Sequence, residues 1–133
     1  MGCIPTFLTL CSYSIHAMPW GVVESELEVT SWLANLPVDE FGHAAFYIDL
    51  LEEKGVHLDE PYSRQLRGKL RELRFYLGRQ QTRISYFIAT GRVIVLLTVF
   101  GKQRRRERSE IDRAERAMKR CTEEGHVKRD SDD

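Results

Sequence analysis

The fold is decided by the stretch LRELRFYLGRQQTRISYFIATGRVIVLLTVFGK, which spans residues 70–102. It holds runs in which apolar and polar side chains alternate, the pattern of strands with one buried face. The runs cover residues 70–77, 82–89 and 92–100. A turn around Gly78 separates the first two, and Thr90-Gly91 stands where a tight hairpin turn is expected. We therefore expect a three-stranded antiparallel meander at the centre of an α+β fold.

The two faces of this meander differ. One face of the first two runs is apolar, whereas the other carries Glu72, Arg74, Tyr76, Arg83, Ser85 and Phe87. The third run is apolar on both faces, which is typical of a strand that is central in its sheet or covered by helices. Helices before the meander would cover one face, and a C-terminal helix would partly close the other.

The segment before the meander predicts a short strand and two helices. The signals place a strand at residues 19–23, a helix at 26–36 with Ser25 opening an S-x-x-E capping box, and a helix at 39–54 closed by Gly55. Both helices carry an apolar stripe, so we expect them to pack together on the apolar face of the sheet.

The remaining segments are less regular. Residues 64–69 are polar, and their secondary structure is ambiguous. They are compatible with a helical turn leading into the sheet. After the meander, Ser109 is expected to cap a third helix, with Asp112 three residues on as a variant capping box. Cys121 falls on the apolar stripe of that helix, which predicts a buried structural cysteine.

Charge is strongly segregated although the formal net charge is zero. Residues 1–61 hold one basic and ten acidic side chains, whereas residues 62–120 hold seventeen basic and five acidic ones. A basic block of this kind is the pattern expected for a polyanion partner. The alternative is a solvated basic face that the acidic half of the same chain balances.

The chain is expected to form one domain over residues 18–121, with an N-terminal extension at 1–17 and a polar tail at 122–133. Met18 is favoured over Met1 as the native start because organised pattern begins directly after it. The three cysteines form no CxxC pair, so neither a disulfide framework nor a metal site is indicated, and a reducing cytoplasm fits best. No apolar run is long enough to span a membrane.

Arginines on the meander are the candidate functional residues. Arg74 and Arg83 can face one another on neighbouring strands, where two like charges about 5 Å apart are costly unless an anion lies between them. Arg71 is a looser third candidate. The basic residues Lys102, Arg104 and Arg106 follow the last strand. The planar guanidinium fork suits phosphate.

Two aromatic side chains extend this hypothesis to nucleic acid. Tyr76 on the Arg74 side and Phe87 on the Arg83 side are placed to stack on a base. The alternative is that Arg74 pairs with Glu72 or Glu110 and simply solvates the sheet.

The order and spacing of several short motifs resemble a known family. The motifs are L-R-E-L-R, T-R-I-S-Y, V-L-L-T-V-F-G-K, the basic run and R-S-E-I-x-x-A. Together they resemble the RelE/ParE superfamily of type II toxins, in the HigB-like branch grouped with phage Gp49-like proteins, over residues 19–121. The resemblance implies two N-terminal helices packed on a small antiparallel sheet with a C-terminal helix.

The resemblance also implies a function. It implies a ribosome-dependent endoribonuclease that cuts mRNA with the substrate's own 2′-hydroxyl as nucleophile, needs no metal or cofactor, and is neutralised by an antitoxin with a helix-turn-helix DNA-binding fold in a toxin–antitoxin hetero-oligomer. Arg74, Arg83, Lys102 and Arg104 match the catalytic positions. Arg71 and Arg106 would hold neighbouring phosphates or ribosomal RNA.

One departure and two alternatives stay open. The last helix opens without the tyrosine of RelE, so no proton carrier is assigned, and Tyr76, His57 and Asp112 are guesses. A ParE-like inhibitor of DNA gyrase and a non-catalytic nucleic-acid-binding remnant are the competing functions.

Overall fold

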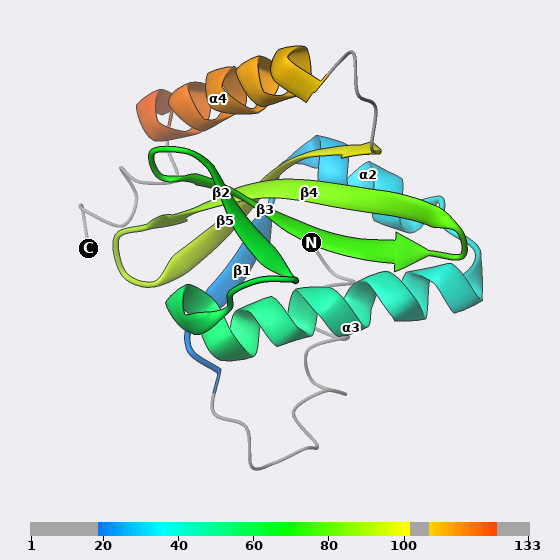
Figure 1. The fold of residues 1–133 in the computed structure, drawn as a ribbon. Coiled ribbons are helices and arrows are strands. Elements are labelled where there is room, and N and C mark those ends of the chain that lie inside the picture. The colour runs from blue at the N-terminus through cyan, green and yellow to red at the C-terminus, as the bar shows by residue number, and fades with distance from the viewer. Residues whose placement is uncertain (1–18, 102–106, 125–133) are drawn as a thin grey trace.

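The computed structural model describes residues 19–101 and 107–124, which form a mixed sheet with helices on both faces (Figure 1). The elements are β1 (Val22–Ser25), α2 (Leu27–Ala34), α3 (Val38–Lys54), the short 3-10 helix η2 (Gly55–His57), β2 (Ser63–Arg67), β3 (Leu70–Leu77), β4 (Gln80–Ala89), β5 (Val93–Gly101) and α4 (Glu107–Glu124). The predicted α+β fold class is confirmed.

The sheet has five strands in the order β1-β5-β4-β3-β2. Its centre is the predicted antiparallel meander of β3, β4 and β5. Two strands extend it beyond the prediction: β1 pairs with β5 in parallel at one edge, and β2 pairs with β3 antiparallel at the other. The expected first strand exists but begins at Val22 rather than at Pro19.

The helical turn suggested for residues 64–69 is wrong, because this segment forms β2 and the turn into β3. Arg67 pairs with Leu70, so Gly68-Lys69 is a two-residue hairpin loop. Gly68 has a φ of 59°, a left-handed value that favours glycine at this position. The loop therefore fixes the register of β2 against β3.

Helices α2 and α3 pack on the face of the sheet that the sequence marks as apolar. Val29 of α2 and Ala44, Ile48 and Leu51 of α3 are buried there against strand residues such as Leu73. The predicted capping box at Ser25 is wrong. Ser25 is the last residue of β1, where it pairs with Leu96, and the strand passes directly into α2.

Helix α4 covers part of the opposite face, as Figure 1 shows. It begins at Glu107, so the predicted N-cap Ser109 lies inside the first turn and is a wrong prediction. Cys121 is buried on its inner face, as predicted. No helix in the described ranges is long and apolar enough to cross a membrane.

Ion pairs fasten α4 to the sheet on both of its flanks. Arg67 at the end of β2 donates hydrogen bonds to Asp112 at 2.8 Å and to Glu115 at 2.7 Å. On the other flank, Arg113 donates to Glu28 of α2 at 2.6 Å. Both contacts lie after the first turn of the helix, so the middle of α4 is the part that these pairs hold in place.

Glycine substitutions test how the N-terminal segment is seated. Gly55 has a φ of 53°, and a Cβ there would lie 2.0 Å from Cδ2 of Trp20. We expect Gly55→Ala to lower the free energy of unfolding by about 2–4 kcal/mol through left-handed strain and overpacking. Gly42, an exposed position inside α3, has no such neighbour, so Gly42→Ala should raise it by about 0.5–1 kcal/mol. Urea denaturation measures both, and a neutral Gly55→Ala would contradict this seating of Trp20.

Candidate functional site

Arg74 and Arg83 lie opposite one another on β3 and β4, as the alternation predicts. Both side chains stand on the α4 face of the sheet. Arg83 is almost fully buried, with 4% of its side chain exposed, whereas Arg74 retains 24%. Two cations this close need a negative charge nearby, and the structure supplies one from within the chain.

That charge is the carboxylate of Glu72, which is fully buried beneath the arginines. Its Oε2 atom lies 3.4 Å from Nε of Arg64 and 3.5 Å from Nε of Arg74. Its Oε1 atom lies 3.6 Å from Nη1 of Arg83. One carboxylate thus joins guanidinium groups from β2, β3 and β4. We call Glu72, Arg64, Arg74 and Arg83 the arginine cluster.

A second carboxylate closes the cluster on the side of α4. Oε2 of Glu107 accepts a hydrogen bond from Nη2 of Arg64 at 3.2 Å and lies 3.5 Å from Nη1 of Arg83. Unlike Glu72, Glu107 is partly open to solvent, with 36% of its side chain exposed. Glu72 therefore lies at the buried bottom of the cluster, whereas Arg64, Arg74 and Glu107 form a rim that solvent can reach.

The buried position of Glu72 disfavours the charged form of its carboxyl group. Burial raises the pKa of Glu72 above its ordinary range, while Arg83, Arg64 and Arg74 act in the opposite direction. Within the described residues neither oxygen of Glu72 accepts a hydrogen bond, and Nε of Arg74 and of Arg83 donate none. Buried polar groups are nearly always hydrogen-bonded, so these under-satisfied groups make the cluster a candidate functional site.

The neighbouring part of the same face is also polar. Ser85 and Thr98 continue the row of Glu72 across β4 and β5, and both are buried. Their hydroxyl groups hydrogen-bond each other, and the backbone N–H of Thr98 donates to Oγ of Ser85 at 3.0 Å. These two residues are satisfied, so the unmet hydrogen-bonding capacity of this row is concentrated at Glu72 and its arginines.

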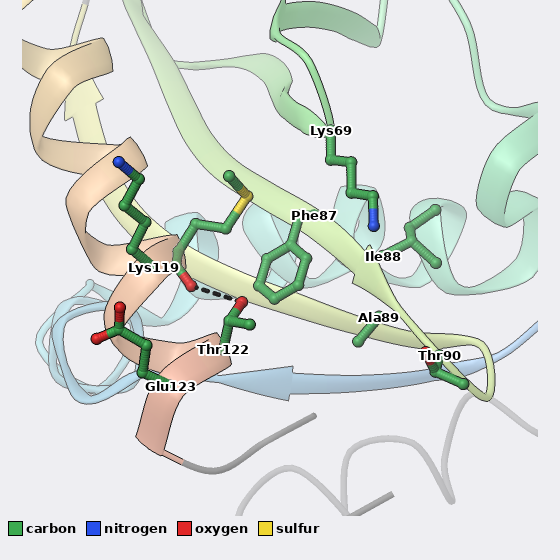
Figure 2. Close-up of a pocket in the computed structure, with 9 residues that line it drawn as sticks. Lys69, Phe87, Ile88, Ala89, Thr90, Lys119, Thr122 and Glu123 are labelled. Atoms are coloured by element: carbon green, nitrogen blue, oxygen red, sulfur yellow. Dashed lines mark hydrogen bonds between the residues drawn. The ribbon is translucent and has the colours of Figure 1, made fainter. Parts of the chain in front are cut away.

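The structure separates the two aromatic candidates. Tyr76 is 58% exposed and shares its face with Arg74, two residues earlier on β3. Phe87 is buried under the C-terminal half of α4, where Figure 2 shows it beside Thr122. It lines a cavity of about 250 Å³ with Lys69 and Lys119. The prediction that Phe87 is placed to stack on a base is therefore wrong.

Three further candidates lie away from the cluster. Arg71 stands on the opposite face of β3, where its Nε donates to Oγ of Ser63 at 3.1 Å. It lines a different cavity, of about 500 Å³, together with His57. Asp112 is paired with Arg67 on the flank of α4. The predicted catalytic residues Lys102 and Arg104 and the predicted RNA-binding residue Arg106 lie outside the described residues.

Three residues of the site were missed as functional candidates. Arg64 pairs in register with Glu72 once β2 is known to be a strand. The two-residue loop at Gly68-Lys69 was the sequence signal for that strand. The alternation placed Glu72 on the same face as the arginines, and its ion pair with Arg74 was predicted as the alternative to phosphate binding. The structure contains this pair at 3.5 Å. Glu107 enters the site only because α4 begins at Glu107, three residues before the helix that Ser109 was expected to cap.

The described residues contain no group of histidine, cysteine or acidic side chains arranged to hold a metal ion. What the cluster offers instead is a set of cationic donors around a buried negative charge. Such an arrangement can bind an anion at its open rim and stabilise additional negative charge there.

Comparison with known proteins identifies the family. Residues 31–119, more than half of the chain, match the family described as phage derived protein Gp49-like. The chain belongs to this family. The predicted Gp49-like branch is thereby confirmed. No curated protein matches the sequence significantly.

Two solved structures resemble this Gp49-like chain. A mutant of the E. coli toxin RelE in the free state has a TM-score of 0.52 and 19% identity, and the match covers 78% of this chain and 99% of that one. A chain of the archaeal RelE–RelB complex from Pyrococcus horikoshii OT3 has a TM-score of 0.48 and 24% identity, and the match covers 63% of this chain and 97% of that one. The first match confirms the predicted RelE-like fold.

The raised pKa of Glu72 has a consequence for stability. Because its folded-state pKa lies above the ordinary 4.5, the folded chain holds the proton more tightly than the unfolded chain does. The contribution of Glu72 to the free energy of unfolding should therefore fall as pH rises from 4.5 through the folded-state value. Glu72→Gln should remove this part of the pH dependence in urea denaturation above pH 4.5.

Glu52 provides the matched control. Burial and the charge of Asp49 raise its pKa too, so Glu52→Gln should remove a separate share of the same slope, on the far side of the molecule. The double variant should show the sum of the two changes. An unchanged slope in Glu72→Gln would contradict the conclusion that burial raises the pKa of Glu72 in the folded chain.

Proposed function

We propose that this Gp49-like chain is the toxin of a type II toxin–antitoxin pair and that it cuts mRNA on the ribosome. The observation that carries the proposal is the pair Arg74 and Arg83, held against the buried Glu72 on the sheet face that α4 leaves partly open. Its location in a RelE-like fold supports a phosphate rather than another anion as the ligand.

The reaction that suits this site is transesterification within the RNA. The 2′-oxygen forms a bond to the adjacent phosphorus, the bond to the 5′-oxygen breaks, and the proton of the 2′-hydroxyl ends on the leaving 5′-oxygen. The products are a cyclic phosphate and a 5′-hydroxyl. The phosphorus passes through a state with an additional negative charge, which fixed guanidinium groups stabilise more strongly than they stabilise the ground state.

Each residue then has a defined task. Arg83 is the rigid member, since burial and the contacts to Glu72 and Glu107 fix its position. Arg74 is the more exposed member and faces the incoming phosphate. Tyr76, exposed on the same face, stacks on a neighbouring base. The basic segment after β5, with Lys102, Arg104 and Arg106, adds contacts to the scissile and adjacent phosphates.

The partner follows from the charge distribution. Residues 62–120 carry an excess of twelve positive charges, seventeen basic against five acidic side chains. A cognate antitoxin is expected to cover this surface with acidic or helical segments and so block access of RNA. The pair would act in the cytoplasm, where the ribosome is the site of cleavage.

Mapping of mRNA 5′ ends after induction of the chain without its antitoxin tests the proposal. Wild type should arrest growth and produce new 5′ ends within translated mRNA. Arg83→Ala should reduce cleavage about 100-fold to 1,000-fold, the effect of removing one transition-state donor. Arg83→Lys should also be impaired, since it keeps the charge but loses the fork.

The matched control is Arg120→Ala, which removes the same charge from the exposed end of α4. It should cleave like wild type, and circular dichroism should show that all variants are folded. A DNA-damage response without mRNA cuts, insensitive to Arg83→Ala, would instead indicate a gyrase inhibitor. Absence of toxicity with intact mRNA would indicate a non-catalytic remnant.

A further inference from the structure

The position of Glu107 in the arginine cluster resembles that of a bound anion. Its carboxylate bridges Nη2 of Arg64 and Nη1 of Arg83, at 3.2 Å and 3.5 Å. Carboxylate and phosphate oxygens engage guanidinium groups in the same way, through charge-assisted hydrogen bonds. A single negative charge at the rim of the cluster therefore already lies where a phosphodiester would bind.

Arg64 is built to hold such an anion. Its Nε atom lies 3.4 Å from Oε2 of the buried Glu72, an ion pair that holds one side of the guanidinium against the sheet. Its Nη2 atom is left for the rim, where Glu107 accepts its hydrogen bond. With 38% of the side chain exposed, Arg64 is more accessible than Arg74 or Arg83. An arginine fixed at one end and open at the other is preorganised for a ligand.

Glu107 can leave this position without detaching α4. It is the first residue of the helix, whereas the contacts that fasten α4 to the body come from Arg113, Asp112 and Glu115 further along. The side chains of Arg64 and Glu107 are also 38% and 36% exposed, and ion pairs between solvent-accessible groups contribute little to stability. Exchange of Glu107 for another anion at the rim therefore leaves the attachment of α4 intact.

We propose that Arg64 is a third phosphate-binding arginine and that Glu107 holds the place of the RNA phosphate in the RNA-free chain, so that RNA binding displaces Glu107. The inference rests on the proposed function in taking an RNA phosphodiester as the ligand. The exchange conserves the charge of the cluster, because one monoanion replaces another. The additional charge of the transition state then favours phosphate over Glu107.

Binding of a non-cleavable RNA tests the inference directly. The probe is a fluorescein-labelled ten-nucleotide 2′-O-methyl RNA, and fluorescence anisotropy at low salt gives its Kd for the purified chain. Glu107→Gln should bind about fivefold more tightly, because it removes the competing carboxylate. Arg64→Ala should bind about tenfold more weakly, and the gain from Glu107→Gln should shrink in the Arg64→Ala background.

The control separates competition from a general change in charge. Glu115→Gln removes a carboxylate from the same helix, paired with Arg67 at 2.7 Å and outside the cluster. It should leave the Kd unchanged within about twofold. An equal gain for both variants, or no gain for Glu107→Gln, would overturn the inference. Loss of mRNA cleavage with unchanged RNA affinity in Glu107→Gln would also overturn it, since Glu107 would then be a catalytic group.

The two proposals fail in different ways. If wild type cuts mRNA but Glu107→Gln gains no affinity, only the displacement of Glu107 is wrong. If Glu107→Gln and Arg64→Ala change the Kd as expected while wild type leaves mRNA intact, the phosphate site stands and the proposed nuclease function is wrong.

Discussion

The structure depends on one buried carboxylate. Glu72 sits at the centre of β3 with no exposed surface, and its ion pairs reach β2, β3 and β4. Without a negative charge in this position, the cross-strand neighbours Arg74 and Arg83 would repel one another on a partly buried face of the sheet. Burial nonetheless raises the pKa of Glu72, which shows that the buried charge has a desolvation cost. An apolar residue in this position would have no such cost.

The two faces of the sheet differ in how much apolar packing they provide. On the α2 and α3 face, apolar residues of all three meander strands form a continuous core. On the other face, an apolar cluster lies under the part of α4 from Ile111 to Cys121, whereas the row of Glu72, Ser85 and Thr98 is polar. Apolar packing is thus supplied by one face and part of the other, and the polar part of the second face is available for an ion-binding site.

Much of this arrangement could be predicted from the sequence, because it depends on local alternation. The bounds of β3, the two-sided burial of β5 and the opposition of Arg74 and Arg83 follow from period-two patterning. Strand β2 could not be recognised by its pattern, since Leu66 is its only large apolar residue. Its strand conformation comes from pairing with β3. The capping predictions at Ser25 and Ser109 also failed, since Ser25 pairs with Leu96 as the last residue of β1 and Ser109 lies inside the first turn of α4.

The full set of residues that form the site could not be predicted from the sequence. Arg64, Glu72 and Glu107 come from three segments that only the register of β2 and the start of α4 bring together. The same geometry divides the predicted residues, since Arg71 alternates to the opposite face and Phe87 lies beneath α4. The alternation of apolar and polar residues therefore predicts the position of the Arg74 and Arg83 pair. The ion pairs that Glu72 and Glu107 make with these arginines depend on the tertiary structure.

A crystal structure of the chain with a 2′-O-methyl RNA tests the central claim most directly. We expect one phosphate of the RNA to lie within hydrogen-bond distance of the guanidinium groups of Arg74 and Arg83, with Glu72 still buried beneath them. A phosphate bound elsewhere, with the arginine cluster unchanged, would contradict the assignment of this cluster as the RNA site.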